Sequence, residues 1–254
     1  MVRARARPNL VAQAGQLIVE RDPRRPSGRL LRQGDMEASY VDLADPTHLE
    51  FDYLRWMRII LRVARAHRVL HVGGGACALP RALAAEDANA RQEVSELSAD
   101  VLAIAREHLG LRHAPALRVR LADGREHVAA QPDAGWDAVV IDAFEGARIP
   151  RHLVTVEALG DVARVSPLAL INVVDNRSAH VVRGVAAGLA AVYPGTWALG
   201  ARVGNTIVVG TRSSLDLNRI RVRAAADPSP ARVTMPRRLA SLVGGAAPWR
   251  DAQP

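Results

Sequence analysis

Apolar positions change their spacing near residue 45, and the change separates two kinds of structure. Before that point, the stretches "QLIVE" (16–20) and "SYVDL" (39–43) alternate apolar and polar residues, as half-buried strands do. The sequence "DPRRPSG" (22–28) predicts a turn, after which "RLLRQG" (29–34) returns as a strand. Residues 1–45 therefore predict a small N-terminal β-hairpin domain.

A helical spacing follows, and strand–helix units then repeat along the chain. We expect Asp45 to cap a helix that has Pro46 at its first position and an apolar stripe from Leu49 to Ala64. Five strands are then predicted, each followed by a helical pattern: the buried strand "RVLHV" (68–72), then "QEVSEL" (92–97), "ALRVRLAD" (116–123), "WDAVVID" (136–142) and "LALINVVD" (168–175).

Repeated strand–helix alternation predicts an α/β fold, in which helices cover both faces of a parallel sheet. We expect the order 3-2-1-4-5, followed by the pair "TWALGARV" (196–203) and "NTIVVGT" (205–211), one of them antiparallel, in a seven-stranded sheet. Residues 46–212 would form this Rossmann-like nucleoside-binding domain. Residues 213–254 form a C-terminal extension, in which "MPRRLASLV" (235–243) predicts a short helix before a loose tail.

The composition narrows the classes of partner. The net charge is +8, and all 34 strongly basic residues are arginine, which indicates a coding bias. These arginines are spread along the chain and gather only at Val2–Arg7 and Arg21–Pro26, so we do not expect a nucleic-acid partner. The single cysteine, Cys77, cannot form an internal disulfide, and no apolar run approaches the roughly 20 residues of a membrane span. We expect a cytoplasmic protein without a membrane partner.

The glycine-rich sequence "HVGGGACALPRALAAE" (71–86) is the first sign of a ligand. A strand that runs into Gly73, Gly74 and Gly75 and then into a helix lets a ligand approach the backbone and the free N–H groups of a helix start. Gly73-x-Gly75-x-x-Ala78 fits the dinucleotide fingerprint, and Glu96 stands near the distance expected of an acid that binds a ribose. These residues leave NAD, another nucleoside, and a turn without a ligand all open.

Two further acids stand at strand ends and change this picture. Asp123 ends the third predicted strand and Asp142 ends the fourth, so both face the crevice in which open α/β sheets bind ligands. Either could simply cap a helix, but together with Glu96 they favour a cationic, adenine-bearing sulfonium cofactor over NAD. No HExxH, paired cysteine or histidine cluster predicts a metal, and GxSxG is absent.

Together these pieces resemble the polyamine aminopropyltransferases, the spermidine synthase family, over residues 28–211. The similar segments are "SYVDLADPTHLEFDYLRWM", "HVGGGACALPRALA", "EVSELSADVLAIAREHL", "RLADGREHV" and "WDAVVIDAFEGARIP". The resemblance implies a small N-terminal β domain before a Rossmann-like class I AdoMet-dependent transferase sheet, in a homodimer. It implies S-adenosylmethionine (AdoMet) or decarboxylated AdoMet as co-substrate, no metal, and a small-molecule amine as acceptor.

The resemblance also assigns roles to residues. It implies that Asp142 orients the attacking amine and takes its proton, as a positioned carboxylate can. It implies two further groups: cofactor-binding residues Gly73, Gly74, Gly75, Glu96, Leu97, Asp123 and Gly124, and substrate-binding residues Tyr53, Glu145 and Glu37.

Three positions depart from the family pattern, all on the amine side. Ala76 stands where the family has an aspartate for the aminopropyl ammonium, Leu54 where a histidine follows the tyrosine, and Glu37 where a glutamine lines the substrate pocket. A methyltransferase acting on a small molecule and a non-catalytic nucleoside-binding protein therefore stay open as alternatives.

Overall fold

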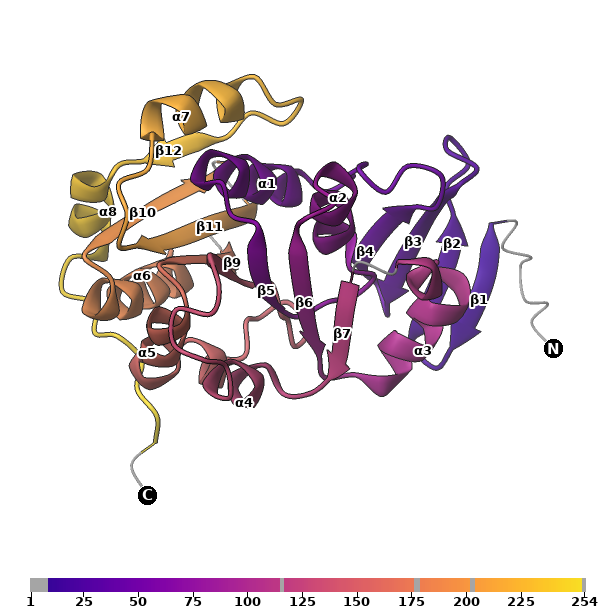
Figure 1. Ribbon diagram of the computed structural model, residues 1–254, viewed down its shortest axis with the longest axis horizontal. Coiled ribbons are helices and arrows are strands. Elements are labelled where there is room, and N and C mark those ends of the chain that lie inside the picture. Colours follow the sequence, from indigo (N-terminus) through magenta and orange to yellow (C-terminus); the bar gives the residue numbers. More distant parts are fainter. Residues whose placement is uncertain (1–8, 115–116, 176–178, 202–203, 253–254) are drawn as a thin grey trace.

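The computed structural model describes residues 9–114, 117–175, 179–201 and 204–252, and the arginine cluster expected at Val2–Arg7 lies outside this part. Two sheets organise the chain (Figure 1). The strands are β1 (Leu10–Ala14), β2 (Leu17–Arg21), β3 (Gly28–Gln33), β4 (Met36–Asp42), β5 (Arg68–Val72), β6 (Arg91–Glu96), β7 (Leu117–Leu121), β8 (Ala138–Ile141), β9 (Leu168–Asp175), β10 (Gly195–Gly200), β11 (Gly204–Thr211) and β12 (Arg232–Thr234). The α-helices are α1 (Asp52–Ala64), α2 (Ala78–Glu86), α3 (Ala99–His108), α4 (Gly124–Ala129), α5 (Val156–Val165), α6 (His180–Val192), α7 (Leu217–Ala225) and α8 (Pro236–Val243).

The N-terminal sheet is an antiparallel meander in the order β1-β2-β3-β4. After it, the expected start of the first long helix at Pro46 is wrong. The Asp45 carboxylate accepts from the Thr47 amide at 3.0 Å and closes a tight turn instead. The helix α1 begins only at Asp52, after Phe51 in an extended conformation. Asp45 followed by proline therefore forms a turn and not a helix start, because its side chain bonds the backbone amide two residues on.

The main sheet has the order β12-β10-β11-β9-β8-β5-β6-β7. The strands β7, β6, β5, β8 and β9 are parallel neighbours, which confirms the order 3-2-1-4-5, and β11 is the antiparallel strand of the final pair. The predicted count of seven is wrong, because the C-terminal extension adds β12 along the edge of β10. The extension also forms α7 and the expected α8, so it is more ordered than a short helix with a loose tail.

Helices cover both faces of the main sheet, and each face has its own hydrophobic cluster. One cluster joins the sheet to α1, α2, α3 and the N-terminal sheet, and the other joins it to α4, α5, α6 and α8. Strands β5, β6 and β8 are buried on both sides, as expected of a parallel sheet inside an α/β domain. Their carboxyl ends therefore meet at one edge, where the loops that follow them form the candidate site.

In the part of the chain that the structure describes, no helix has both the length and the apolar character needed to cross a membrane.

Candidate functional site

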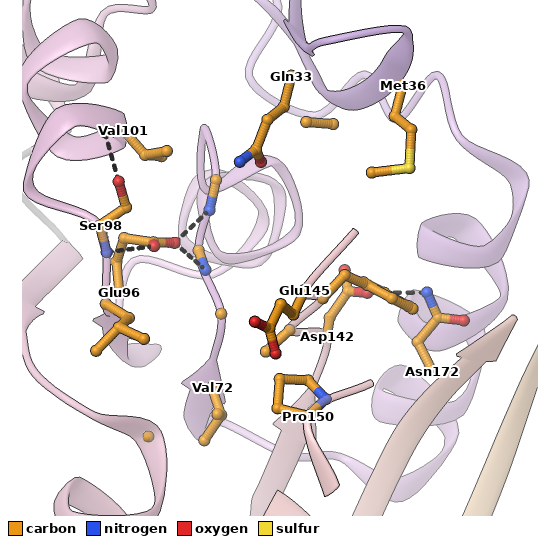
Figure 2. A pocket seen from close by; sticks show the side chains of 18 of the residues that line it. Gln33, Met36, Val72, Glu96, Ser98, Val101, Asp142, Glu145, Pro150 and Asn172 are labelled. Carbon is orange, nitrogen blue, oxygen red and sulfur yellow. Dashed lines mark hydrogen bonds between the residues drawn. The ribbon is translucent and has the colours of Figure 1, made fainter. Parts of the chain in front are cut away.

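A cavity of about 930 Å³ opens at the carboxyl ends of β5, β6, β7 and β8, and the N-terminal sheet forms its opposite wall. It brings together every residue that the sequence singles out for the site. These are Glu37, Tyr53, Gly73, Gly74, Gly75, Glu96, Leu97, Asp123, Gly124, Asp142 and Glu145. Figure 2 shows Glu96 on one side of this cavity and Asp142, Glu145 and Asn172 on the other.

The loop after β5 needs glycine because the backbone after β8 lies in close contact with it. Gly73 has a φ of +86°, and a Cβ atom there would lie 2.3 Å from the carbonyl oxygen of Asp142. A similar contact fixes Gly124, whose Cβ would lie 2.2 Å from the Val72 side chain. Any side chain at these positions would push apart the strand ends that carry the site.

Glu96 holds the glycine loop in place. One of its carboxylate oxygens, Oε2, accepts from the amides of Gly74 and Gly75, both at 3.0 Å. The other, Oε1, accepts from the Ser98 amide at 2.9 Å (Figure 2). A carboxylate offers about four acceptor directions, so it can still accept from a ribose hydroxyl. The residue expected to bind the ribose therefore also shapes the loop beside it.

The remaining amides of the loop are also paired. Gly73 donates to the Ser95 carbonyl at 2.9 Å, Ala76 donates to Ser39 Oγ at 3.1 Å, and Cys77 donates to the Gly74 carbonyl at 2.6 Å. Every amide from 73 to 77 thus has a partner within the protein. A dinucleotide-binding loop uses such amides for the pyrophosphate, so this pairing argues against NAD.

Asp123 has two sets of partners. Its Oδ1 accepts from the amides of Arg125 and Glu126 at 2.9 and 3.1 Å, so it caps α4. Its Oδ2 lies 3.1 Å from His152 Nε2, at the cavity wall. Burial raises the pKa of Asp123, but the hydrogen bonds from Glu126, His152 and Arg125 outweigh burial and lower it overall. Asp123 can therefore cap α4 with Oδ1 and bind a ligand with Oδ2, so the two expected roles are compatible.

Asp142 lies just beyond the end of β8, at the other side of the cavity. Its carboxylate accepts from Asn172 Nδ2 at 2.8 Å (Figure 2) and from the Tyr53 hydroxyl. Protein surrounds it except toward the cavity, and burial raises its pKa to about 6, against the lowering effect of the hydrogen bonds from Asn172 and Tyr53. A carboxylate with such a pKa is ionised at neutral pH and is a better proton acceptor than an ordinary aspartate.

Two residues of the site were missed by the sequence analysis. Asn172 is 1% exposed, and its Oδ1 has no hydrogen-bond partner among the residues that the structure describes. Its signal was present, since it is the single polar residue before Asp175 in the apolar run "LALINVVD". The other, His152, comes from the loop before α5, and nothing in the local sequence placed it beside Asp123.

The charge of the cavity is opposite to that of the chain. Seven carboxylates line it, and no described arginine does, although the net charge of the protein is +8. Among the described residues of the lining, His152 is the one histidine. The acids are Glu37, Glu50, Asp52, Glu96, Asp123, Asp142 and Glu145. Low-dielectric walls with charges of one sign concentrate ligands of the opposite sign, so the cavity suits a cation.

The three departures from the family pattern have clear structural counterparts. Ala76 is fully buried and Leu54 is 6% exposed, so neither offers a polar group to the cavity. Glu37 lines the cavity, but its carboxylate lies 3.3 Å from the Arg32 guanidinium. Among the described residues, no cluster of three or more His, Cys, Asp or Glu side chains is arranged to hold a metal ion.

No protein-family model and no curated protein sequence matches the chain. Its fold is similar to that of a probable spermidine synthase from Corynebacterium glutamicum, with 24% identity, a TM-score of 0.86 and 96% of each chain covered. A spermidine synthase in complex with the transition state analogue AdoDATO has 13% identity and a TM-score of 0.63, covering 93% of this chain and 85% of that one. Human methyltransferase-like protein 13 in complex with SAH has 18% identity and a TM-score of 0.56, covering 80% and 96%.

These similarities establish the fold. The protein shares the fold of these structures, in which a small antiparallel sheet precedes a Rossmann-like sheet with helices on both faces. The resemblance recognised in the sequence is confirmed at this level.

Proposed function

We propose that this protein transfers an aminopropyl group from decarboxylated AdoMet to an amine, a step of polyamine biosynthesis, with Asp142 accepting the proton. Solved structures of the same fold carry AdoDATO and SAH, which supports an AdoMet-related ligand. The glycine loop, Glu96 and Asp123, which line the cavity, would hold the nucleoside, and Asp142, Tyr53 and Glu145 would face the acceptor amine. A homodimer and a cytoplasmic location stay predictions.

The acid lining of the cavity carries the proposal. Decarboxylated AdoMet has a sulfonium and an ammonium and lacks a carboxylate, so seven acids match its charge. AdoMet also has an α-carboxylate, for which the described lining offers no arginine and the loop 73–77 offers no unpaired amide. A carboxylate left unpaired among acids would weaken binding. The cavity therefore suits the decarboxylated cofactor.

The chemistry follows from the position of Asp142. An alkyl ammonium has a pKa near about 10 and must lose a proton before it can attack. The carboxylate of Asp142 accepts this proton, the amine nitrogen forms a bond to the aminopropyl carbon next to sulfur, and the carbon–sulfur bond breaks. The bonding electrons pass to sulfur, so the sulfonium leaves as neutral methylthioadenosine. Asn172 keeps the carboxylate oriented by its 2.8 Å hydrogen bond.

Methyl transfer from AdoMet is a second candidate, and one observation favours it. Ala76 is fully buried where an aspartate would hold the aminopropyl ammonium, so the protein lacks that charge-assisted hydrogen bond. Its loss costs on the order of 1.5–3 kcal/mol. Because that ammonium belongs to the aminopropyl donor, its missing partner weakens the case for decarboxylated AdoMet and favours methyl transfer from AdoMet as the alternative.

Product analysis distinguishes the candidates. The protein is incubated with decarboxylated AdoMet and a panel of diamines and polyamines and, in parallel, with AdoMet and the same panel. Chromatography then detects methylthioadenosine or S-adenosylhomocysteine. We expect methylthioadenosine, with putrescine a poor acceptor. S-adenosylhomocysteine would support the methyltransferase, and neither product with retained nucleoside binding would support a binding protein.

A further inference from the structure

Residues 249–251, which we call the C-terminal strap, fold back from the far end of the sequence against α4, α5 and α6. The Trp249 carbonyl accepts from the Val156 amide at 2.8 Å, which places the strap against the start of α5. The Trp249 ring packs against Gly184 of α6, where a Cβ would lie 2.8 Å from the ring. Figure 1 shows the yellow end of the chain descending beside α5.

The strap ends in a two-pronged ion pair. Both oxygens of Asp251 accept from the Arg125 guanidinium, one at 2.8 Å from Nη1 and the other from Nη2. Asp251 also accepts from the Thr155 hydroxyl. The Arg125 hydrogen bonds lower the pKa of Asp251 to about 2, so the pair stays ionised at any ordinary pH. Bidentate pairs of this kind fix orientation as well as distance.

Arg125 links the strap to both members of the Asp123–His152 contact. Its backbone amide donates to Asp123 Oδ1 at 2.9 Å, and its Nη1 reaches the carbonyl oxygen of His152 at 3.5 Å. The neighbouring Arg151 guanidinium lies over the Trp249 ring, 5.6 Å from its centroid. The strap therefore contacts the two segments that present Asp123 and His152 to the cavity.

We infer that the C-terminal strap, through Asp251 and Arg125, positions Asp123 and His152 and so sets the affinity and base specificity of the nucleoside site. The inference rests on the proposed function and adds that Asp123 Oδ2, the oxygen that does not cap α4, would face the purine. Adenine presents an amine where hypoxanthine presents a carbonyl, and a fixed carboxylate accepts from the first and repels the second. Supporting residues of this kind hold the side chains that touch the ligand in the geometry that binding needs.

The test measures binding of methylthioadenosine and methylthioinosine by calorimetry in the full-length protein. Asp251→Asn and Arg125→Gln should each weaken methylthioadenosine binding about tenfold and reduce the preference for adenine over hypoxanthine. The double variant should lose no more than either single variant, because both remove one interaction. Asp251→Glu should restore part of the preference. Asp133→Asn is the matched control, since that exposed carboxylate pairs with Arg164 away from the strap, and it should change binding less than twofold.

Three results would overturn the inference. One is Asp251→Asn binding both nucleosides as the wild type does. Another is an equal loss for both bases accompanied by a lower unfolding temperature, which would indicate a purely structural strap. If the wild-type protein binds neither nucleoside, the proposed function fails, and the inference fails with it.

Discussion

The two ends of the cavity are built in opposite ways. At the nucleoside end, the polar groups are paired within the protein: Glu96 accepts from three amides, and Asp123 caps a helix. At the acceptor end, Asp142 is held with a raised pKa, and Asn172 Oδ1 is buried without a partner in the described part of the chain. One end is stabilised by several hydrogen bonds to its carboxylates, whereas the other buries a carboxylate with a raised pKa beside an amide oxygen without a partner.

This difference separates the end of the cavity where the same carboxylates support both folding and binding from the end where they do not. A carboxylate that accepts several hydrogen bonds stabilises the folded state, so its removal should harm both folding and binding. A carboxylate kept ionised in a buried site opposes folding, so its removal should abolish chemistry and stabilise the protein. The same kind of substitution, acid to amide, is therefore expected to change stability in opposite directions at the two ends.

Asp142→Asn should have the largest effect. It keeps the size of the side chain and an acceptor for Asn172, but it removes the proton acceptor, so methylthioadenosine formation should fall at least about 100-fold. Asp133→Asn is the control, since that side chain is 77% exposed and pairs with Arg164 at the surface. A rate that survives in Asp142→Asn would show that this carboxylate only shapes the loop.

The same variant should be more stable than the wild type at neutral pH. The folded-state pKa of about 6 lies above the ordinary value of 3.8, so the wild type loses stability as pH rises from about 4 to 6. The loss amounts to on the order of 2–3 kcal/mol above pH 6. Asp142→Asn should thus have a higher unfolding temperature than the wild type at pH 7 and the same unfolding temperature below about pH 4. A less stable variant at pH 7 would contradict the raised pKa.

Glu96→Gln should shift stability the other way. The amide turns an N–H donor toward the amides of Gly74, Gly75 or Ser98, so the variant should lose about 1–3 kcal/mol of unfolding free energy. Nucleoside binding should weaken by roughly 10- to 100-fold, equivalent to about 1.5–3 kcal/mol. Glu107→Gln, at a 69% exposed side chain, is the control in calorimetry and thermal unfolding. Unchanged stability in Glu96→Gln would remove the contrast between the two ends.

The pH dependence of turnover sharpens the assignment of Asp142. With a pKa of about 6, the ionised fraction falls about tenfold between pH 8 and pH 5, and the rate at saturating substrates should fall with it. A profile that stays flat down to pH 5 would mean that another group accepts the proton.

The smallest expected effect concerns the basic surface. Scattered arginines give a diffuse field, so duplex DNA should bind weakly, without sequence preference, and binding should fade steeply with added salt. Titration at two salt concentrations measures this. Sequence-specific binding at physiological salt would make nucleic acid the leading partner.

Much of the α/β domain could be predicted because strands such as β5, β8 and β9 are apolar runs that alternate with helical spacing. The strand β12 could not be predicted, since three residues become a strand only by pairing with β10. In the site, the positions of Glu96, Asp123 and Asp142 at strand ends could be predicted from their spacing along the sequence. The pairing of the loop amides, the orphan oxygen of Asn172 and the place of His152 arise from tertiary packing, which no local pattern encodes.

Calorimetry with decarboxylated AdoMet, AdoMet and NAD tests the central claim most directly, because the three ligands differ in the charges that the cavity must meet. The acid lining and the paired loop amides predict that decarboxylated AdoMet binds at least about tenfold more tightly than AdoMet, because the extra carboxylate finds no cation. NAD should show no binding. Tighter binding of AdoMet, or clear binding of NAD, would contradict the account.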